Sequence, residues 1–170
     1  MNPSRVHWIV DFVAFQALWL GAVVFQAPWM CFGILIARLL LSVKIAHEVF
    51  LLVSLAPVGI VIDWSLMQAG VFQFNAGTFP AWLALLWCGF ILTLNQSMGW
   101  LRDRHLGVQA LLGAIFGPVS YFTGWRFDAV SFGFALMPTL IGLSLIWGIL
   151  LPSLMVLQQR LIRRRRLLDY

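Results

Sequence analysis

The sequence predicts an all-α protein, a polytopic bundle of membrane-spanning helices. Of its 170 residues, 62% are hydrophobic and 10% are charged, and the mean hydropathy is +0.93. These values lie far outside the range of soluble domains. The apolar residues recur in runs of about 17 to 25, the length that a helix needs to cross the hydrocarbon. Transmembrane β-strands would alternate apolar and polar residues over about ten positions, and the sequence has no such alternation.

Six apolar runs are predicted to be the transmembrane helices of a single membrane domain, residues 1–170. The first run follows Arg5, as in a secretory signal, but it carries Asp11 and Gln16 and has no small-residue cleavage site, so we expect a retained span. Pro28 and Pro80 suit the first turn of a helix, where a missing N–H costs nothing. The predicted spans are residues 6–25, 28–43, 49–69, 80–101, 106–125 and 132–157.

Charge indicates the orientation of these spans. Six spans place both termini on one side, and the basic residues gather at that set of helix ends, with only Arg126 at the other. By the positive-inside rule the basic side is cytoplasmic, so we expect cytoplasmic N and C termini. Residues 158–170 then form a polybasic cytoplasmic tail. Anionic lipid headgroups are expected partners of four arginines there, at about 1 kcal/mol each: Arg163, Arg164, Arg165 and Arg166.

Asp63 is a carboxylate inside the third predicted span. A central aspartate costs about 2.5 to 3.5 kcal/mol by insertion scales, so we expect Asp63 to face protein or water. Gly59 lies one turn away on the same face, which lets a neighbouring helix approach closely. Because the third span runs outward, Asp63 is predicted in the outer third of the membrane.

The fifth predicted span offers partners at the same depth. Gly113, Gly117 and Gly124 form a small-residue stripe that includes a G-x-x-x-G pair, so this helix is expected to pack tightly against another. Ser120 and Tyr121 lie at about the depth of Asp63, and Arg126 at the boundary of the span could reach down to it. The predicted outer cluster is Asp63, Ser120, Tyr121 and Arg126, although Arg126 also has a nearby partner in Asp128.

A second polar group is predicted toward the cytoplasm. Asp11 in the first span, Arg38 in the second and Asn95 in the fourth lie at similar depth. An Asp11–Arg38 pair with Asn95 nearby would satisfy all three side chains. Such pairs hold bundles together more often than they carry out chemistry.

The sequence offers no catalytic or metal-binding motif. His7, His47 and His105 fall at cytoplasmic helix ends without the spacing of membrane diiron enzymes. Walker, G-x-S-x-G and H-E-x-x-H patterns are absent. We therefore expect no catalytic residue, no metal and no cofactor. A nucleic-acid partner is not expected either, because the chain has no room for a folded basic module.

The stretches VIDWSLMQAGVFQF, PAWLALLWCGFILTLNQSMGWL and LLGAIFGPVSYFTGWRFDAV resemble a family of small inner-membrane proteins of Gram-negative bacteria, domain of unknown function twenty-eight seventy-eight. The resemblance covers nearly the whole chain and is strongest over residues 59–130. It implies an inner-membrane protein and no known activity; members are often encoded near enzymes that modify membrane fatty acids. The positions that match the family pattern are Gly59, Asp63, Phe72, Phe74, Pro80, Trp82, Asn95, Gly117, Pro118, Ser120 and Tyr121.

The preferred functional hypothesis is a non-enzymatic inner-membrane protein that binds or handles lipid, or assists a lipid-modifying enzyme. The alternative is a small transporter or proton-coupled permease that uses Asp63, Tyr121 and Asn95 along its pathway. An intramembrane enzyme with Asp63 as acid or base ranks lowest, since no nucleophile or metal partner is evident. The surroundings of Asp63 discriminate among these hypotheses.

Overall fold

The computed structural model describes residues 3–168, and the side chains of residues 8–165. Within this range the fold is all-helical apart from one two-stranded sheet. The elements are α1 (Pro3–Val23), α2 (Pro28–Leu40), α3 (Ile45–Gln68), β1 (Phe72–Gln73), α4 (Ala81–Asn95), the 3₁₀ helix η1 (Gly99–Asp103), α5 (Leu106–Arg126), β2 (Ser131–Phe132) and α6 (Leu136–Leu168).

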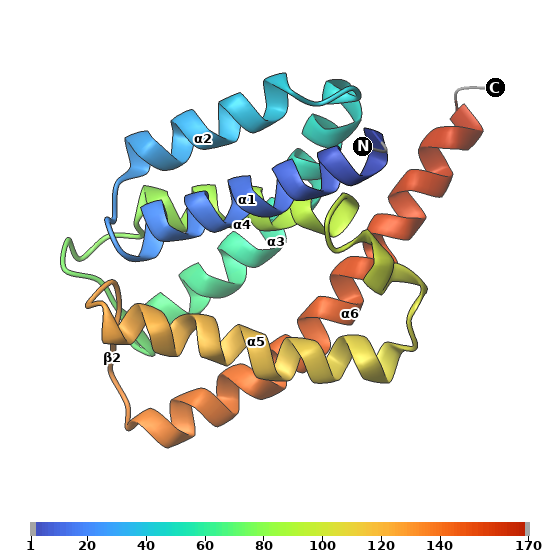
Figure 1. Cartoon of the computed structure of the whole chain (residues 1–170). Helices are drawn as coiled ribbons and strands as arrows, with labels where there is room; N and C mark the ends of the chain where they lie inside the picture. The colour runs from blue at the N-terminus through green and yellow to red at the C-terminus, as the bar shows by residue number, and fades with distance from the viewer. Residues whose placement is uncertain (1–2, 169–170) are drawn as a thin grey trace.

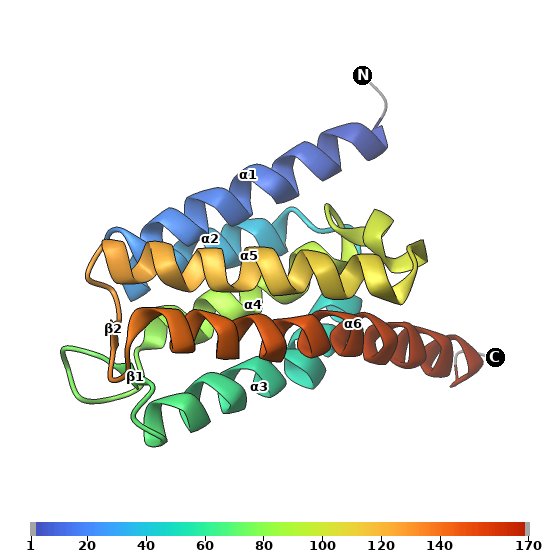
Figure 2. The same cartoon turned by 90° about the horizontal axis from the view of Figure 1, so that it is seen from below.

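The helices form two groups with α4 at the centre of the larger one. Helices α1, α2 and α3 all contact α4, while α5 and α6 pack along each other as a long antiparallel hairpin. This hairpin lies along one side of the molecule and the α1–α2 hairpin lies on the other (Figure 1). The start of α1 and the end of α6 lie at the same end of the bundle (Figure 2).

Three helices of the described chain are long and apolar enough to span a membrane: α3, α5 and α6 up to Arg165. Shorter apolar segments occur in α1, α2 and α4. The 15 residues of α4 would extend about 22 Å, less than the hydrocarbon thickness of about 30 Å. The fold therefore confirms a helical bundle, whereas six spans stay a prediction.

Two predicted boundaries are wrong. The fourth segment was expected to be helical over 80–101, but α4 ends at Asn95 and the chain turns before η1. The sixth was expected from residue 132, but Ser131 and Phe132 form β2, and α6 begins at Leu136. Polar side chains at 95–97 bond to groups outside α4, as described below. Residues 158–168 of the predicted polybasic tail are helical and continue α6.

The short sheet joins the two groups of helices at the end opposite the termini. Phe72 pairs with Phe132 and Gln73 with Ser131, in antiparallel register. Phe72 is 1% exposed, and its ring stacks on Tyr121 of α5, with the ring centroids 5.0 Å apart. Gly133 approaches the carbonyl of Gly70 so closely that a Cβ would collide with it. The aromatic segment between α3 and α4 is thus partly buried.

Glycines allow two tryptophans to lie against helix backbones. A Cβ at Gly59 would collide with the indole of Trp87, and one at Gly117 would collide with the indole of Trp147. At Gly113 it would meet the backbone carbonyl of Trp147. The stripe on α5 therefore packs against α6. A Cβ at Gly124 would make only ordinary van der Waals contact, so the close-packing argument does not extend to that residue.

Candidate functional site

The carboxylate of Asp63 lies inside the bundle and accepts two hydrogen bonds from neutral donors. Its side chain is 1% exposed. The Trp87 indole N–H from α4 donates to Oδ2 at 2.7 Å, and the Tyr121 hydroxyl from α5 donates to Oδ1 at 2.6 Å. Each oxygen thus has one donor, and three helices meet at this carboxylate. We call Asp63, Trp87 and Tyr121 the outer cluster.

Stacked indoles hold the outer cluster in place. Trp87 stacks on Trp147 of α6, with ring centroids 5.3 Å apart and planes 8° apart. Gly59 leaves room for one indole and Gly117 for the other. Because Gly59 precedes Asp63 by one helical turn, the glycine that admits the Trp87 ring lies beside the acceptor for its N–H. Local sequence therefore provides both the space and the hydrogen bond.

The structure brings Asp63 and Tyr121 together but not the other two residues of the predicted group. The Ser120 hydroxyl accepts from the Trp19 indole N–H at 3.1 Å and makes no bond to Asp63. Arg126 is exposed near the end of α5 and forms no hydrogen bond or ion pair with Asp63. Trp87 was missed. Two facts could have indicated this contact: a buried indole N–H needs an acceptor, and Asp63 is a carboxylate within a predicted span.

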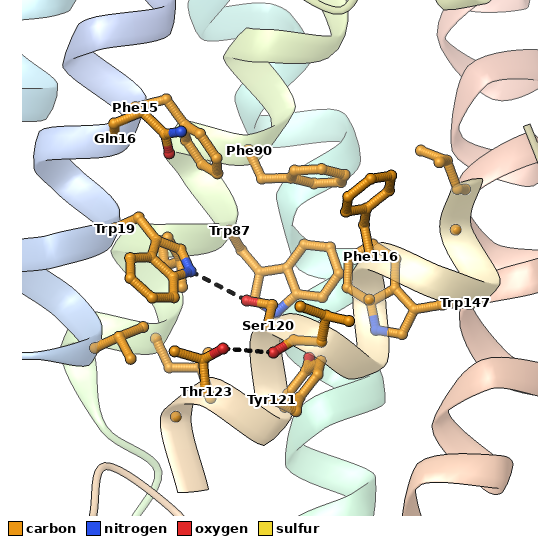
Figure 3. A pocket seen from close by; sticks show the side chains of 18 of the residues that line it. Phe15, Gln16, Trp19, Trp87, Phe90, Phe116, Ser120, Tyr121, Thr123 and Trp147 are labelled. Carbon is orange, nitrogen blue, oxygen red and sulfur yellow. Dashed lines mark hydrogen bonds between the residues drawn. The ribbon is translucent and has the colours of Figure 1, made fainter. Parts of the chain in front are cut away.

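A cavity of about 780 Å³ lies beside the outer cluster, between α1, α4 and the α5–α6 hairpin. Figure 3 shows Phe90 and Trp147 on one side of it and Trp19 on another, with Phe116 and Ser120 from α5. Several lining side chains are partly open to the outside: Leu20 is 47% exposed, Phe116 64% and Val119 51%. These belong to α1 and α5, so the cavity opens sideways between those two helices.

The cavity wall carries few polar groups and no charge. Trp19 and Ser120 join α1 to α5 by the hydrogen bond described above (Figure 3). Thr123 also lines the cavity, and its hydroxyl donates to the carbonyl of Val119 at 2.7 Å. Gln16 lines it from α1. Asp63 is not among the lining residues, although Trp87 and Tyr121 are, so these two side chains separate the carboxylate from the cavity.

A second polar cluster lies toward the end of the bundle that holds both termini. Arg38 of α2 donates to Asp11 of α1 at 2.8 Å and makes a two-pronged contact with Glu48 of α3, at 3.0 and 3.1 Å. The exposed fractions of these side chains are 8%, 2% and 1%. The α4 terminus joins through Gln96, which donates to Glu48, and Ser97, which donates twice to Asp11. We call these five residues the inner cluster.

The inner cluster differs from the predicted one in its third member. Asn95 was expected beside Asp11 and Arg38, but its Oδ1 accepts from Arg102 at 3.4 Å instead. Arg102 also donates to Gln158 of α6 and to the carbonyl of Leu94, at 3.3 Å each. Its guanidinium thus bonds to a backbone carbonyl near the end of α4. Glu48 was missed although it is the only glutamate of the chain.

Two arginines of the basic stretch have exposed side chains, and a third contacts α3. Arg163 and Arg164 are exposed. Arg165 donates to the carbonyl of Ala46 at 3.1 Å and lies over the Phe50 ring, 5.0 Å from its centroid. The side chain of Arg166 lies outside the described side chains, as does that of His7. Among the described residues, no group of three or more His, Cys, Asp or Glu side chains is placed to hold a metal ion.

The chemistry available at the cavity is therefore binding by apolar contact, with hydrogen bonds from a few neutral groups. Searches among curated proteins and solved structures give no match to the chain. One family model does match it, described as "Protein of unknown function (DUF2878)", and the match extends over residues 8–153. This range includes α4, α5 and all residues of both clusters and of the cavity wall. The chain belongs to the DUF2878 family.

Proposed function

We propose that this protein is a multi-pass protein of the bacterial inner membrane that binds the apolar part of a membrane lipid in its lateral cavity. It performs no chemistry on the lipid, and it holds the lipid for itself or for a lipid-modifying enzyme. The observation that carries this proposal is the uncharged cavity of about 780 Å³ that opens between α1 and α5.

The volume of the cavity and the direction of its opening both support a lipid as the ligand. Pockets for small molecules have volumes of about 300 to 1,000 Å³, so this cavity has the capacity of a true ligand site. Its open side is bordered by apolar side chains on helix faces that would touch lipid in a bilayer. An apolar cavity with that opening is in contact with acyl chains, whereas a polar solute would have to cross hydrocarbon to reach it.

The same proposal includes six spans with both termini in the cytoplasm. Support comes from the position of both ends of the described chain at one end of the bundle (Figure 1). The short helix α4 is compatible with a span because it is enclosed by α1, α2 and α3, and a non-helical turn at membrane depth is tolerated where protein surrounds it. Cysteine-accessibility labelling from each side of the membrane tests this orientation.

Anionic headgroups are the proposed partners of the basic end of α6. Arg163 and Arg164 have exposed side chains. Each would contribute about 1 kcal/mol next to an anionic leaflet. Arg165 is already engaged with α3, so we expect it to contribute less to lipid attraction than its two neighbours.

The permease alternative has less support. A proton pathway through Asp63 needs water access to its carboxylate. That carboxylate is 1% exposed, holds two hydrogen bonds and is separated from the cavity by Trp87 and Tyr121. These contacts favour a structural role for Asp63.

Lipid co-purification tests the proposed function. The protein is extracted in mild detergent and washed until annular lipid is removed, and the retained lipid is identified by mass spectrometry. Two variants of α5 form a matched pair: Val119→Trp places a bulky ring in the cavity, and Ile115→Trp places it on the same helix outside the cavity wall. The two positions are 51% and 47% exposed.

We expect a retained lipid in the wild-type protein and in Ile115→Trp, at close to one per chain, and at least fivefold less in Val119→Trp. Retention of bulk lipid in bulk proportions, unchanged by Val119→Trp, would count against the proposal. Both variants should elute as a single folded species, which the experiment checks by size-exclusion chromatography.

A further inference from the structure

We infer that the lateral cavity selects a neutral lipid whose buried part is a flat, unsaturated ring carrying a hydrogen-bond acceptor, the chemistry of an isoprenoid quinone. This inference rests on the proposed lipid-binding function and adds the class of lipid. Three features of the cavity wall carry it: the absence of charge, the abundance of aromatic rings, and an unused hydroxyl donor.

The first feature excludes charged headgroups from the cavity. None of the 25 lining residues is Lys, Arg, Asp or Glu. A phosphate or carboxylate there would lose its hydration without a counter-charge, at a cost of several kcal/mol or more. The part of the ligand inside the cavity is therefore neutral.

The second feature favours a flat ring over a saturated chain. Ten of the 25 lining residues are Phe, Trp or Tyr, against 15% of the whole sequence. Trp19, Phe90 and Phe116 lie around the space near Ser120 (Figure 3). A saturated chain gains only apolar contact from such a wall. A conjugated ring gains stacking or edge-to-face contacts as well, which add to area burial.

The third feature places a donor where a ring substituent would reach it. The Ser120 hydroxyl accepts from Trp19, and among the described residues its own proton has no protein acceptor. Thr123 on the same helix does use its proton, in the bond to the Val119 carbonyl. Ser120 can therefore donate to a carbonyl oxygen in the cavity, while Trp19 keeps its orientation.

A quinone ring combines these properties. It is neutral and planar, it is electron-poor beside electron-rich indoles, and its oxygens accept hydrogen bonds. Its isoprenoid tail would leave through the opening between α1 and α5 into the surrounding lipid. No redox step is part of this inference, which concerns binding alone.

Competition against a photoreactive lipid tests the ligand class. The full-length protein in detergent is labelled with a phospholipid that carries a diazirine on its acyl chain, and three competitors of equal tail length are titrated. These are a fully ring-substituted alkyl benzoquinone, an alkylbenzene and an alkylcyclohexane. Full ring substitution prevents addition of Cys88 or Cys31 to the quinone.

Variants separate the donor from its surroundings. Ser120→Ala removes the donor, Thr123→Val removes a hydroxyl whose proton is already used, and Trp19→Phe removes the α1–α5 bridge but leaves the serine. We expect the quinone to compete at least tenfold better than the alkylcyclohexane, with the alkylbenzene between them. Ser120→Ala should weaken the quinone about fivefold, the worth of one hydrogen bond. Ser120→Ala should leave the alkylbenzene unchanged, and Thr123→Val should change the quinone less than twofold. Trp19→Phe alters the aromatic wall itself, so it should weaken the quinone and the alkylbenzene by a similar factor.

The outcomes distinguish failure of the ring preference from failure of the proposed lipid-binding function. Equal competition by all three ring compounds, with labelling intact, would overturn the ring preference and leave lipid binding standing. If Ser120→Ala weakens the quinone and the alkylbenzene equally, as Trp19→Phe does, the loss belongs to the wall or the bridge, and the role of the donor is overturned. Labelling that no competitor reduces, and that Val119→Trp leaves unchanged, would overturn the lipid site itself.

Discussion

The two buried carboxylate clusters satisfy their charges in opposite ways. In the inner cluster two carboxylates share one guanidinium, and three helices and the turn after α4 contribute to the group. In the outer cluster a single carboxylate holds an indole N–H and a phenol O–H, with no cation. The inner cluster borders a space of only about 10 Å³, whereas the outer cluster adjoins the large cavity.

This difference indicates that the two clusters have different roles in the protein. The members of an ion-paired group depend strongly on one another for stability, because loss of one member leaves a buried charge without a partner. Neutral donors bind a carboxylate without adding a charge beside the cavity, so the adjacent wall stays suited to an uncharged lipid. The inner cluster fixes the helices, and the outer cluster shapes the wall of the site.

The largest effect is expected from Arg38→Met. This change leaves Asp11 and Glu48 buried together without their shared cation, and we expect a loss of about 3 to 5 kcal/mol in the free energy of unfolding. Denaturant titration in detergent measures it. A triple variant, Arg38→Met with Asp11→Leu and Glu48→Leu, should recover much of the loss, since it removes the unpaired charges. A loss below 1 kcal/mol for the single variant would contradict the coupling.

A smaller effect is expected from Asp63→Leu. It leaves the Trp87 N–H without an acceptor, while the Tyr121 hydroxyl can turn toward the cavity that it lines. We expect a loss of about 2 kcal/mol, below that of Arg38→Met. Asp63→Asn keeps one acceptor oxygen and should lose about half as much. If Asp63→Leu destabilises the protein more than Arg38→Met, the outer cluster contributes more to stability than the inner cluster, which would contradict the roles assigned to them.

Gly117→Ala probes the packing beneath the outer cluster. The new Cβ would collide with the Trp147 indole, and such overpacking costs about 1 to 3 kcal/mol. Gly142→Ala on α6 is the matched control, because a Cβ there meets nothing within 4 Å. It should leave stability equal or slightly raised, since alanine favours helix over glycine. Thermal unfolding followed by tryptophan fluorescence compares the two; equal midpoints would argue against a tight indole stack.

The smallest effect is expected from Arg126→Gln. Because Arg126 is exposed and does not pair with Asp63, its replacement should leave the unfolding midpoint unchanged. Circular dichroism during thermal unfolding measures this. A clear drop in the midpoint would mean that the outer cluster contains a cation after all, and the contrast between the clusters would vanish.

The level of a residue along the helix bundle was predictable from the sequence, but the direction in which its side chain points from the helix was not. The rise per residue placed Asp63 level with Tyr121, and Asp11 level with Arg38, and hydrogen bonds join both pairs. Hydropathy does not report which neighbour faces a side chain. Charge therefore suggested Arg126 for Asp63, where an indole from α4 provides the second donor.

The end of α4 and the short sheet were also not predictable from the hydropathy pattern. Apolar residues resume at Met98 and include Trp100 and Leu101, so hydropathy extended the helix to residue 101. Gln96 and Ser97 instead bond to Glu48 and Asp11, which lie far away in sequence. Pairing of β1 with β2 is equally non-local, and two-residue strands leave no periodic signal. The cavity itself depends on the gap between α1 and α5, which only tertiary packing determines.

Mapping the photolabelled residues tests the central claim most directly, that the lateral cavity holds lipid. The diazirine phospholipid is bound, excess lipid is washed away in detergent, and labelled positions are located by peptide mass spectrometry. We predict label on cavity-lining residues such as Trp19 and Phe116, with at least fivefold less on them in Val119→Trp and no loss in Ile115→Trp. Label spread evenly over the exposed faces of α5 and α6, and insensitive to Val119→Trp, would contradict the claim.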